Sequence, residues 1–233
     1  MSQKKGSAGS GSSGRGLDKV RVKRKKGRKA SSQRWLQRQL NDSYVFEAQK
    51  AGYRSRAAFK LIELNDKFDL FNPGMHVIDL GAAPGGWTQI ALDKYKAANV
   101  VGVDLLEVEP VAGATLFVGD LYDDDMPEKL QTALGQKADV VLSDMAANTV
   151  GHPPTDHLRT IALAELAADL ALTTLKKGGH FVCKVFQGGA NKALLNLLKG
   201  QFEMVKHYKP PASRKGSPET YLVAKDFIGD VES

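Results

Sequence analysis

The chain has 233 residues, of which 42% are hydrophobic and 25% charged, and its formal net charge is +7 at pH 7. This length can bury one substantial core and is too short for two large domains. No apolar run approaches the roughly 20 residues that span a bilayer, and a single cysteine, Cys183, excludes disulfides within the chain, so we expect a cytoplasmic protein without membrane contact.

The positive charge is concentrated at the N-terminus. Residues 1–34 hold 12 Lys or Arg against Asp18 alone, a net charge of +11, whereas the remaining residues carry a net charge of −4. Residues 1–31 are rich in Gly, Ser, Lys and Arg, so they cannot bury enough apolar surface to offset the entropy lost on ordering. We predict a disordered tail here, and two interpretations stay open: an RNA-binding arm that meets phosphates, or a solubilising tail.

A structured domain is expected over residues 32–227. Residues 32–54 have the spacing of one or two short helices with a break at 41–43, and we expect Trp35 and Phe46 to pack this N-terminal extension onto the domain. The next helix is predicted from Arg56 to Phe68 with Ser55 as its N-cap, and it carries Lys60 beside its apolar positions. Residues 228–233 are predicted to form a short C-terminal tail.

The next stretch, Val77–Trp87, combines a buried strand with a glycine-rich turn. Gly81, Gly85 and Gly86 let the backbone turn sharply and lie close to a ligand at the carboxyl end of a parallel strand. The dinucleotide fingerprint G-x-G-x-x-G requires glycine where the chain has Ala83, and that fingerprint serves a pyrophosphate. The sequence therefore favours a nucleoside ligand without phosphate, such as S-adenosylmethionine.

Three acids follow successive predicted strands. Asp79 is expected to flank the amino acid part of such a ligand, together with residues 81–86, the glycine loop. Asp104 lies at the distance downstream where a carboxylate meets ribose hydroxyls, and Asp120 could accept from an adenine amino group. Any one of them alone is equally well read as a solvated strand end, but three in register favour a binding site.

Strands and helices alternate along the rest of the chain. Lys177–Gly179 is expected to end the long helix that follows the fourth strand. The pattern predicts a three-layer α/β domain with a mostly parallel seven-stranded sheet and helices on both faces. The strands are predicted at 76–80, 100–103, 116–118, 140–143, 180–185, 203–207 and 220–225, and the helices between them at 88–95, 127–134, 156–176 and 190–199.

Charged side chains also occur where the later strands end or begin. Asp144 ends the fourth strand, and Lys184 stands in the otherwise apolar run Phe-Val-Cys-Lys-Val-Phe. A lysine in such a strand must reach solvent, pair with a carboxylate or shift its pKa. Asp144 and Glu219, which opens the last strand, are natural partners for Lys184 and Lys60.

These motifs together resemble the FtsJ family. The matching segments are Ser-Arg-Ala-Ala-Phe-Lys60-Leu, Asp79-Leu-Gly-Ala-Ala-Pro-Gly-Gly-Trp87, Ser-Asp144-Met-Ala, Lys184-Val-Phe-Gln-Gly and Ser-Pro-Glu219-Thr-Tyr. The resemblance implies a Rossmann-like methyltransferase fold with an antiparallel last strand, and S-adenosylmethionine as cofactor. It further implies methylation of the ribose 2'-hydroxyl of a uridine in large-subunit ribosomal RNA, on the assembled subunit. It also implies a catalytic tetrad of Lys60, Asp144, Lys184 and Glu219, and it places Gly85, Trp87, Asp104, Asp120 and Asp144 around the cofactor.

For this chemistry we assign Lys184 as general base, oriented by Asp144, with Lys60 positioning the ribose or phosphate and Glu219 supporting the network. Lys184 as an ammonium that stabilises the developing alkoxide is equally compatible with the sequence. We expect a monomer. We also expect no metal site, because His152 and His157 lack partner residues at zinc spacing. Two other functions stay open: a ribosome-assembly factor without catalysis, and a tRNA 2'-O-methyltransferase.

Overall fold

The computed structural model describes residues 36–37, 39–147, 151–187 and 192–229. The chain divides into two compact units, Met1–Val45 and Phe46–Ser233. The predicted tail at 1–31 and Trp35 lie outside the described residues. The predicted domain boundaries stay predictions.

In the first unit, the described residues form helical turns at 36–37 and 39–40, followed by a break at 41–42. The helix α2 (Ser43–Ala51) then begins and continues into the second unit. The Asp42 carboxylate accepts a hydrogen bond from the backbone N–H of Tyr44 at 3.2 Å, an interaction that stabilises a helix start. The predicted packing role is wrong for Phe46, which is 53% exposed.

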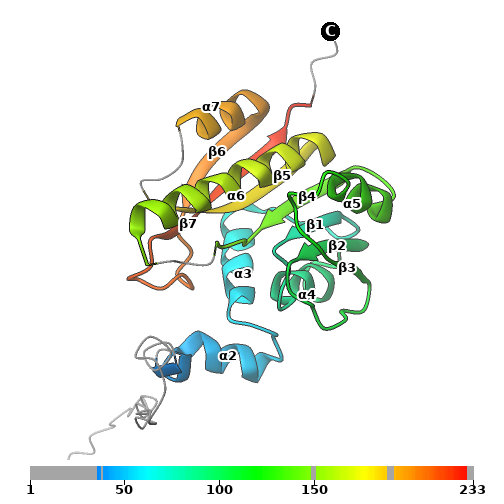
Figure 1. Cartoon of the computed structure of the whole chain (residues 1–233). Coiled ribbons are helices and arrows are strands. Elements are labelled where there is room, and N and C mark those ends of the chain that lie inside the picture. Colours follow the sequence, from blue (N-terminus) through cyan, green and yellow to red (C-terminus); the bar gives the residue numbers. More distant parts are fainter. Residues whose placement is uncertain (1–35, 38, 148–150, 188–191, 230–233) are drawn as a thin grey trace, which may run out of the picture. The chain divides into compact units, whose positions relative to one another are not determined.

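The second unit alternates strands and helices as the sequence predicts (Figure 1). Its sheet has seven strands in the order β3-β2-β1-β4-β5-β7-β6. The elements are β1 (His76–Leu80), β2 (Asn99–Asp104), β3 (Ala114–Val118), β4 (Ala138–Ser143), β5 (Leu175–Phe186), β6 (Phe202–Tyr208), β7 (Glu219–Phe227), α3 (Ala57–Phe68), α4 (Gly86–Asp93), α5 (Met126–Leu134), α6 (Pro153–Thr174) and α7 (Lys192–Gln201).

Pairing directions agree with the predicted fold class. The strands β3, β2, β1, β4 and β5 are parallel to one another. The last strand, β7, lies between β5 and β6 and is antiparallel to both. The chain therefore has the α/β sheet with one reversed strand that the sequence predicts.

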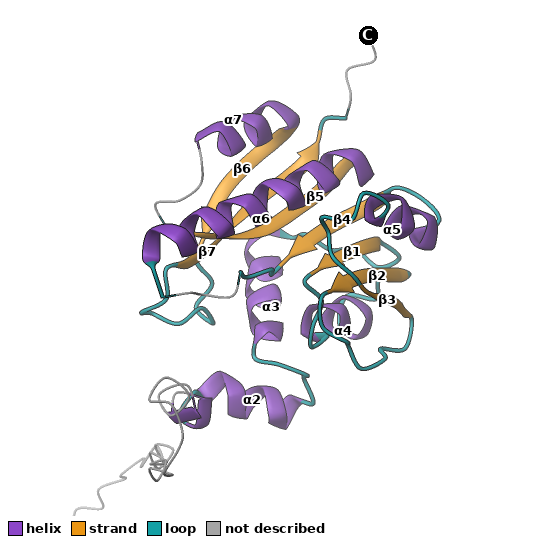
Figure 2. Ribbon diagram, in the orientation of Figure 1, coloured by secondary structure: helices purple, strands orange, loops and turns teal. Residues whose placement is uncertain are grey.

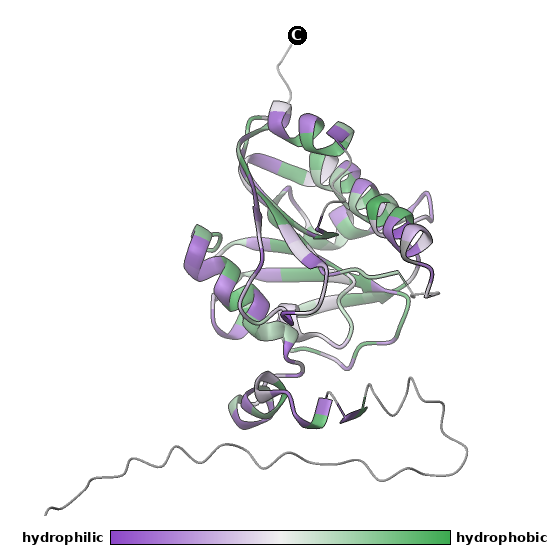
Figure 3. Ribbon diagram, turned by 90° about the vertical axis from the view of Figure 1, so that its left-hand side faces the viewer, coloured by the Kyte–Doolittle hydropathy of each residue, from purple (hydrophilic) through white to green (hydrophobic). Residues whose placement is uncertain are grey.

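Helices cover both faces of the sheet, with α6 in front of it and α3 behind it in Figure 2. Alternate strand residues face opposite ways. Ile78 and Cys183 belong to the core that includes residues of α5, α6 and α7. Val77 and Val182 belong to the core that includes residues of α3 and α4. Figure 3 shows the helices on the two sides of the sheet in a view turned by 90°.

The strand register brings the predicted functional residues to one edge of the sheet. Ser143, directly before Asp144, pairs with Cys183, directly before Lys184. Because β7 is antiparallel to β5, its first residue pairs near the end of β5, and Glu219 pairs with Phe186. The carboxyl ends of the parallel strands and the start of β7 therefore meet at one place.

Two local predictions are wrong. The helix α3 begins at Ala57 without a side-chain capping bond, and Ser55 packs against Gly86, where its Oγ would lie 2.5 Å from an added Cβ. Residues Lys177–Gly179 belong to β5 rather than to a helix end. Gly178 has a φ of +77° near an irregularity in the β4–β5 pairing, and a positive φ suits a β-bulge as well as a helix cap.

None of the helices within the described part of the chain is both long and apolar enough to cross a membrane.

Candidate functional site

The four residues of the predicted tetrad meet at the edge of the sheet. Lys60 comes from α3, Asp144 follows β4, Lys184 lies near the end of β5 and Glu219 opens β7. The Lys184 Nζ lies 3.1 Å from the Asp144 Oδ1 and donates to the Asp144 backbone carbonyl at 2.5 Å. The Lys60 Nζ lies 3.6 Å from both the Asp144 Oδ1 and the Glu219 Oε2.

The lysine in the apolar strand β5 is thus explained by pairing. The side chain of Lys184 is 5% exposed and that of Lys60 is 10% exposed, so neither is a solvated surface lysine. Each has a carboxylate within ion-pair distance, which a buried charge requires. Cys183, the neighbour of Lys184, faces the opposite core and is fully buried. Its burial raises the pKa of the thiol to about 12.

Asp144 is the centre of the cluster. Burial by itself would raise the pKa of its carboxyl, but the charges of Lys184 and Lys60 and a hydrogen bond from Tyr221 outweigh that effect and lower the pKa. Asp144 therefore carries a negative charge at neutral pH, between two lysines.

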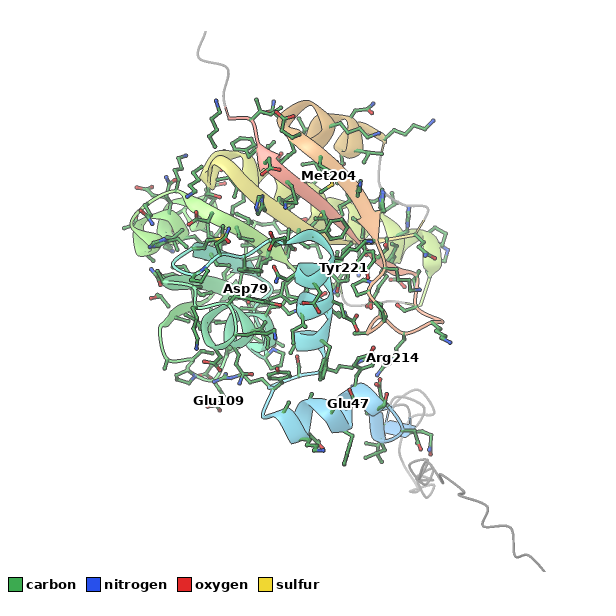
Figure 4. All side chains as sticks on the ribbon, turned by 180° about the vertical axis from the view of Figure 1, so that it is seen from behind. Glu47, Asp79, Glu109, Met204, Arg214 and Tyr221 are labelled. Atoms are coloured by element: carbon green, nitrogen blue, oxygen red, sulfur yellow. The ribbon has the colours of Figure 1, made fainter. Side chains whose placement is uncertain are left out.

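Tyr221 completes the cluster and was missed by the sequence analysis. Its hydroxyl donates to the Asp144 Oδ1 at 2.6 Å, and the Lys60 Nζ lies 5.5 Å from its ring centroid. Tyr221 is fully buried, and in Figure 4 it lies beside α3. The sequence contains only a partial signal: Glu219 and Tyr221 are two residues apart in one strand and so share a face of the sheet, but this spacing does not show that the face meets Asp144.

A cavity lies beside the tetrad. Three of the predicted cofactor residues, Gly81, Asp104 and Asp120, line it. Met145, which directly follows Asp144, lines it too, so one short segment joins the tetrad to the cavity. The remaining walls are mostly apolar and are formed by Val103, Leu105, Gly119, Leu121, Ala146 and Leu163.

The two carboxylates in the cavity are held by backbone N–H groups. The Asp104 Oδ2 accepts from Ala83 at 2.9 Å, and its Oδ1 accepts from Leu106 at 2.9 Å. The Asp120 Oδ1 accepts from Tyr122 at 3.1 Å. Each carboxylate oxygen has two lone pairs, so both side chains keep acceptor positions for a ligand.

The other predicted cofactor residues do not line the cavity and lie in or near the glycine loop. Asp79 is 1% exposed, and its Oδ2 accepts from the Thr88 hydroxyl at 2.6 Å. The Trp87 Nε1 donates to the Ala57 carbonyl at 2.7 Å. Gly85 and Gly86 begin α4. Direct contact of Asp79, Gly85, Gly86, Trp87 and Asp144 with a cofactor stays a prediction.

Burial raises the pKa of Asp79 to about 7, although the hydrogen bond from Thr88 acts in the opposite direction. The negative charges of Asp144 and Asp104 raise it further. The carboxyl beside the glycine loop therefore changes protonation near neutral pH. Among the residues that the structure describes, no group of three or more His, Cys, Asp or Glu side chains is arranged to hold a metal ion.

Comparison with known proteins relates this site to methyltransferases. Residues 53–227 match the family described as FtsJ-like methyltransferase. A protein of Sphingopyxis alaskensis named ribosomal RNA large subunit methyltransferase E is 59% identical over 96% of this chain and 97% of its own. A protein of the same name from Granulibacter bethesdensis is 61% identical over 89% of this chain and 90% of its own.

A solved structure shows the same relationship. A Plasmodium falciparum protein, described as a candidate ribosomal RNA methyltransferase, superposes with a TM-score of 0.68 and 31% identity. The match covers 76% of this chain and all of the other.

Proposed function

The chain belongs to the FtsJ-like methyltransferase family, and on this premise we propose that it methylates large-subunit ribosomal RNA, with S-adenosylmethionine as methyl donor and a ribose 2'-hydroxyl as acceptor. The observation that carries the proposal is the short connection between the Lys184–Asp144 pair and the cavity. Asp144 binds the lysine, and the next residue, Met145, lines the cavity.

The lining of the cavity supports adenosine as the ligand. Its apolar walls suit a base, and the carboxylates of Asp104 and Asp120 can accept hydrogen bonds from ribose hydroxyls and from an amino group. Gly81, with a φ of +78°, leaves no room for a side chain, because an added Cβ would lie 2.7 Å from the Met145 Cγ. Glycine at this position therefore lets the Met145 segment lie directly against the end of β1 at this wall.

S-adenosylmethionine, when bound, supplies a methyl group on a sulfonium, whose departure leaves a neutral thioether. The protein's tasks are then to align the acceptor oxygen and to manage its proton. Lys184 is suited to the second task. Its described contacts are two acceptors of one residue, the carboxylate and the carbonyl of Asp144, and a lysine nitrogen has a third position.

The third position of Lys184 supports both roles considered for it. A neutral amine that donates two N–H groups to Asp144 retains a lone pair, which can remove the 2'-hydroxyl proton. An ammonium instead retains a third N–H, which can stabilise the developing negative charge. A rate that rises with pH until the amine is neutral would indicate the base, and a rate that falls over that range would indicate the ammonium.

Lys60 and Glu219 complete the proposed site. Lys60 lies within 3.6 Å of two carboxylates, so its ammonium is held at the edge of the tetrad. We assign it to binding the ribose or an adjacent phosphate of the RNA, with Glu219 fixing its position. Uridine as the target base and the assembled subunit as the preferred substrate stay predictions, which a comparison of free RNA with subunits would test.

The test uses unmodified large-subunit ribosomal RNA and labelled S-adenosylmethionine. Lys184→Met should abolish label transfer and leave donor binding in place. The matched control is Lys176→Met, because Lys176 also lies on β5 and pairs with an aspartate, Asp139, at the opposite end of the strand. Equal transfer by wild type and Lys184→Met would refute the proposed role of Lys184. Normal subunit maturation in cells with Lys184→Met would instead favour an assembly factor without catalysis.

A further inference from the structure

Arg54 connects three segments that surround the cavity, although no part of the proposed chemistry uses it. It lies between α2 and α3. Its Nη1 donates to the Glu109 carbonyl at 2.5 Å, and its Nη2 donates to the Pro110 carbonyl at 2.6 Å. Both carbonyls belong to residues 105–113, the connection between β2 and β3, in which Glu109 is labelled in Figure 4.

The same guanidinium lies against the glycine loop. Its Nη1 is 3.5 Å from the Pro84 carbonyl. A Cβ added at Gly85 would lie 3.1 Å from both the Cδ and the Nη1 of Arg54, and 3.3 Å from Val108. Gly85, whose φ is +94°, therefore gives the arginine room to lie across the loop and reach the connection beyond it.

The main chain of Arg54 is anchored to the helix that follows the glycine loop. Its N–H donates to the Gln89 Oε1 at 3.0 Å, and the Gln89 Nε2 donates to the Gly52 carbonyl at 3.0 Å. Gln89 lies in α4. The side chain thus extends from a fixed base.

The connection held by Arg54 forms part of the cavity wall. It follows Asp104 directly, and its first residue, Leu105, lines the cavity. Leu105 and Leu106 are each 67% exposed, so apolar burial contributes little to holding them. Asp104 ties the start of the connection to Ala83 inside the site, and Arg54 ties its later part to the same loop from outside.

We propose that Arg54 is a positioning residue for the donor: it holds the 105–113 connection against the glycine loop and so keeps Asp104 and Leu105 in place to bind adenosine. The inference rests on the proposed function for the identity of the ligand. Arginine is required because its planar fork can donate to two successive carbonyls at once, whereas a lysine ammonium is a single point charge.

The first measurement is titration calorimetry of the full chain with S-adenosylhomocysteine, the product form of the donor. Arg54→Met removes both hydrogen bonds to the connection and should raise the dissociation constant about tenfold, and Arg54→Lys should restore little. The control, Lys94→Met, removes the same charge at the end of α4 and should leave affinity within about twofold. Single-turnover transfer at saturating donor should stay within about threefold in Arg54→Met, because the tetrad is intact.

Hydrogen exchange supplies the readout that is independent of the ligand. In Arg54→Met without ligand, amides of residues 105–113 should exchange faster, while those of β1 and β4 should not. An unchanged dissociation constant for Arg54→Met, or unchanged exchange in residues 105–113, would overturn the inference. Failure of the wild type itself to bind S-adenosylhomocysteine would count against the proposed function. That result is distinguishable, because the exchange measurement would still report on the contact of Arg54 with residues 105–113.

Discussion

Two neighbouring strands, β1 and β4, lead to aspartates with little solvent exposure whose pKa values are shifted in opposite directions. Asp79, on β1, has its pKa raised to about 7 by burial. Asp144, after β4, has its pKa lowered in spite of burial, because Lys184, Lys60 and Tyr221 surround it. Burial alone therefore does not decide the charge of a carboxylate in this domain; its neighbours do.

The opposite pKa shifts of Asp144 and Asp79 distinguish two regions, the tetrad and the surroundings of the glycine loop. Near the tetrad, a permanent negative charge holds two lysines together. Beside the glycine loop, the charge of Asp79 varies around neutral pH. The first region is built to position charged groups for chemistry, and the second to keep a loop in place with a single hydroxyl–carboxyl contact.

The largest effect is expected for Asp144→Asn, which removes the charge that distinguishes the two regions. Lys184 would then be buried without a carboxylate partner, and Lys60 would keep only Glu219. Methyl transfer should fall by about 10²–10⁴-fold, the usual contribution of a positioned acid or base, and the free energy of unfolding by about 3 kcal/mol. Single-turnover kinetics and urea unfolding measure the two changes.

The control for this substitution is Asp125→Asn, because Asp125 forms an exposed ion pair with Lys129 on α5. It should alter neither measurement. A loss of stability no greater in Asp144→Asn than in Asp125→Asn would contradict the role assigned to the Asp144 charge.

A smaller effect with a distinct pH dependence is expected for Asp79→Asn. The folded protein raises the pKa of Asp79 from an ordinary 3.8 to about 7, so folding favours the protonated form, and the contribution to stability is lost as pH rises through 7. Asparagine is neutral at every pH. The unfolding free energy of Asp79→Asn relative to wild type should therefore increase by about 2 kcal/mol between pH 5 and pH 8.

Urea unfolding at the two pH values is the measurement for Asp79. Thr88→Val provides a comparison, because it removes the hydroxyl that donates to the carboxylate and should make the wild-type pH dependence steeper. A difference between Asp79→Asn and wild type that does not change with pH would show that Asp79 is ionised throughout.

Tyr221→Phe tests one contact of the tetrad region. It removes the hydrogen bond to Asp144 but keeps the ring beneath Lys60. We expect transfer to be about tenfold slower and stability to be about 1–2 kcal/mol lower, the usual effect of a hydrogen bond to a charged group. Tyr122→Phe, at a side chain that is 62% exposed, is the matched control, and an effect of equal size there would sink the prediction.

The smallest effect is expected on the cavity side, for Asp120→Asn. Asparagine keeps an oxygen for the Tyr122 N–H but weakens acceptance from a donor ligand. Calorimetry should show a dissociation constant about fivefold higher for S-adenosylhomocysteine, with transfer at saturating donor unchanged. Asp124→Asn, an exposed neighbour, should match wild type, and a lower rate at saturation in Asp120→Asn would place Asp120 in the chemistry instead.

The sequence predicts the sheet and the meeting of the tetrad because strand ends are a local signal. An apolar strand interrupted by Lys184 requires a partner, and parallel strands bring their carboxyl ends together. The contact of Tyr221 with Asp144 was not predicted because it depends on the register of β5 with the reversed strand β7, where Lys184 pairs with Tyr221. Sequence spacing does not fix that register.

Errors at element ends have a similar origin. Gly178 was read as a helix terminator, yet its positive φ belongs to the first part of β5. One residue type serves both purposes, and only the pairing with β4 distinguishes them. Arg54 gave no signal at all, because its partners are backbone carbonyls, which every sequence contains.

The most direct test of the central claim is to determine which atom of the RNA receives the methyl group. Large-subunit ribosomal RNA methylated by the wild-type protein would be digested to nucleosides and analysed by mass spectrometry. The account predicts that the added methyl is on the ribose and that Lys184→Met, with unimpaired binding of S-adenosylhomocysteine, adds none. A methyl group found on the base, or ribose methylation that persists in Lys184→Met, would contradict it.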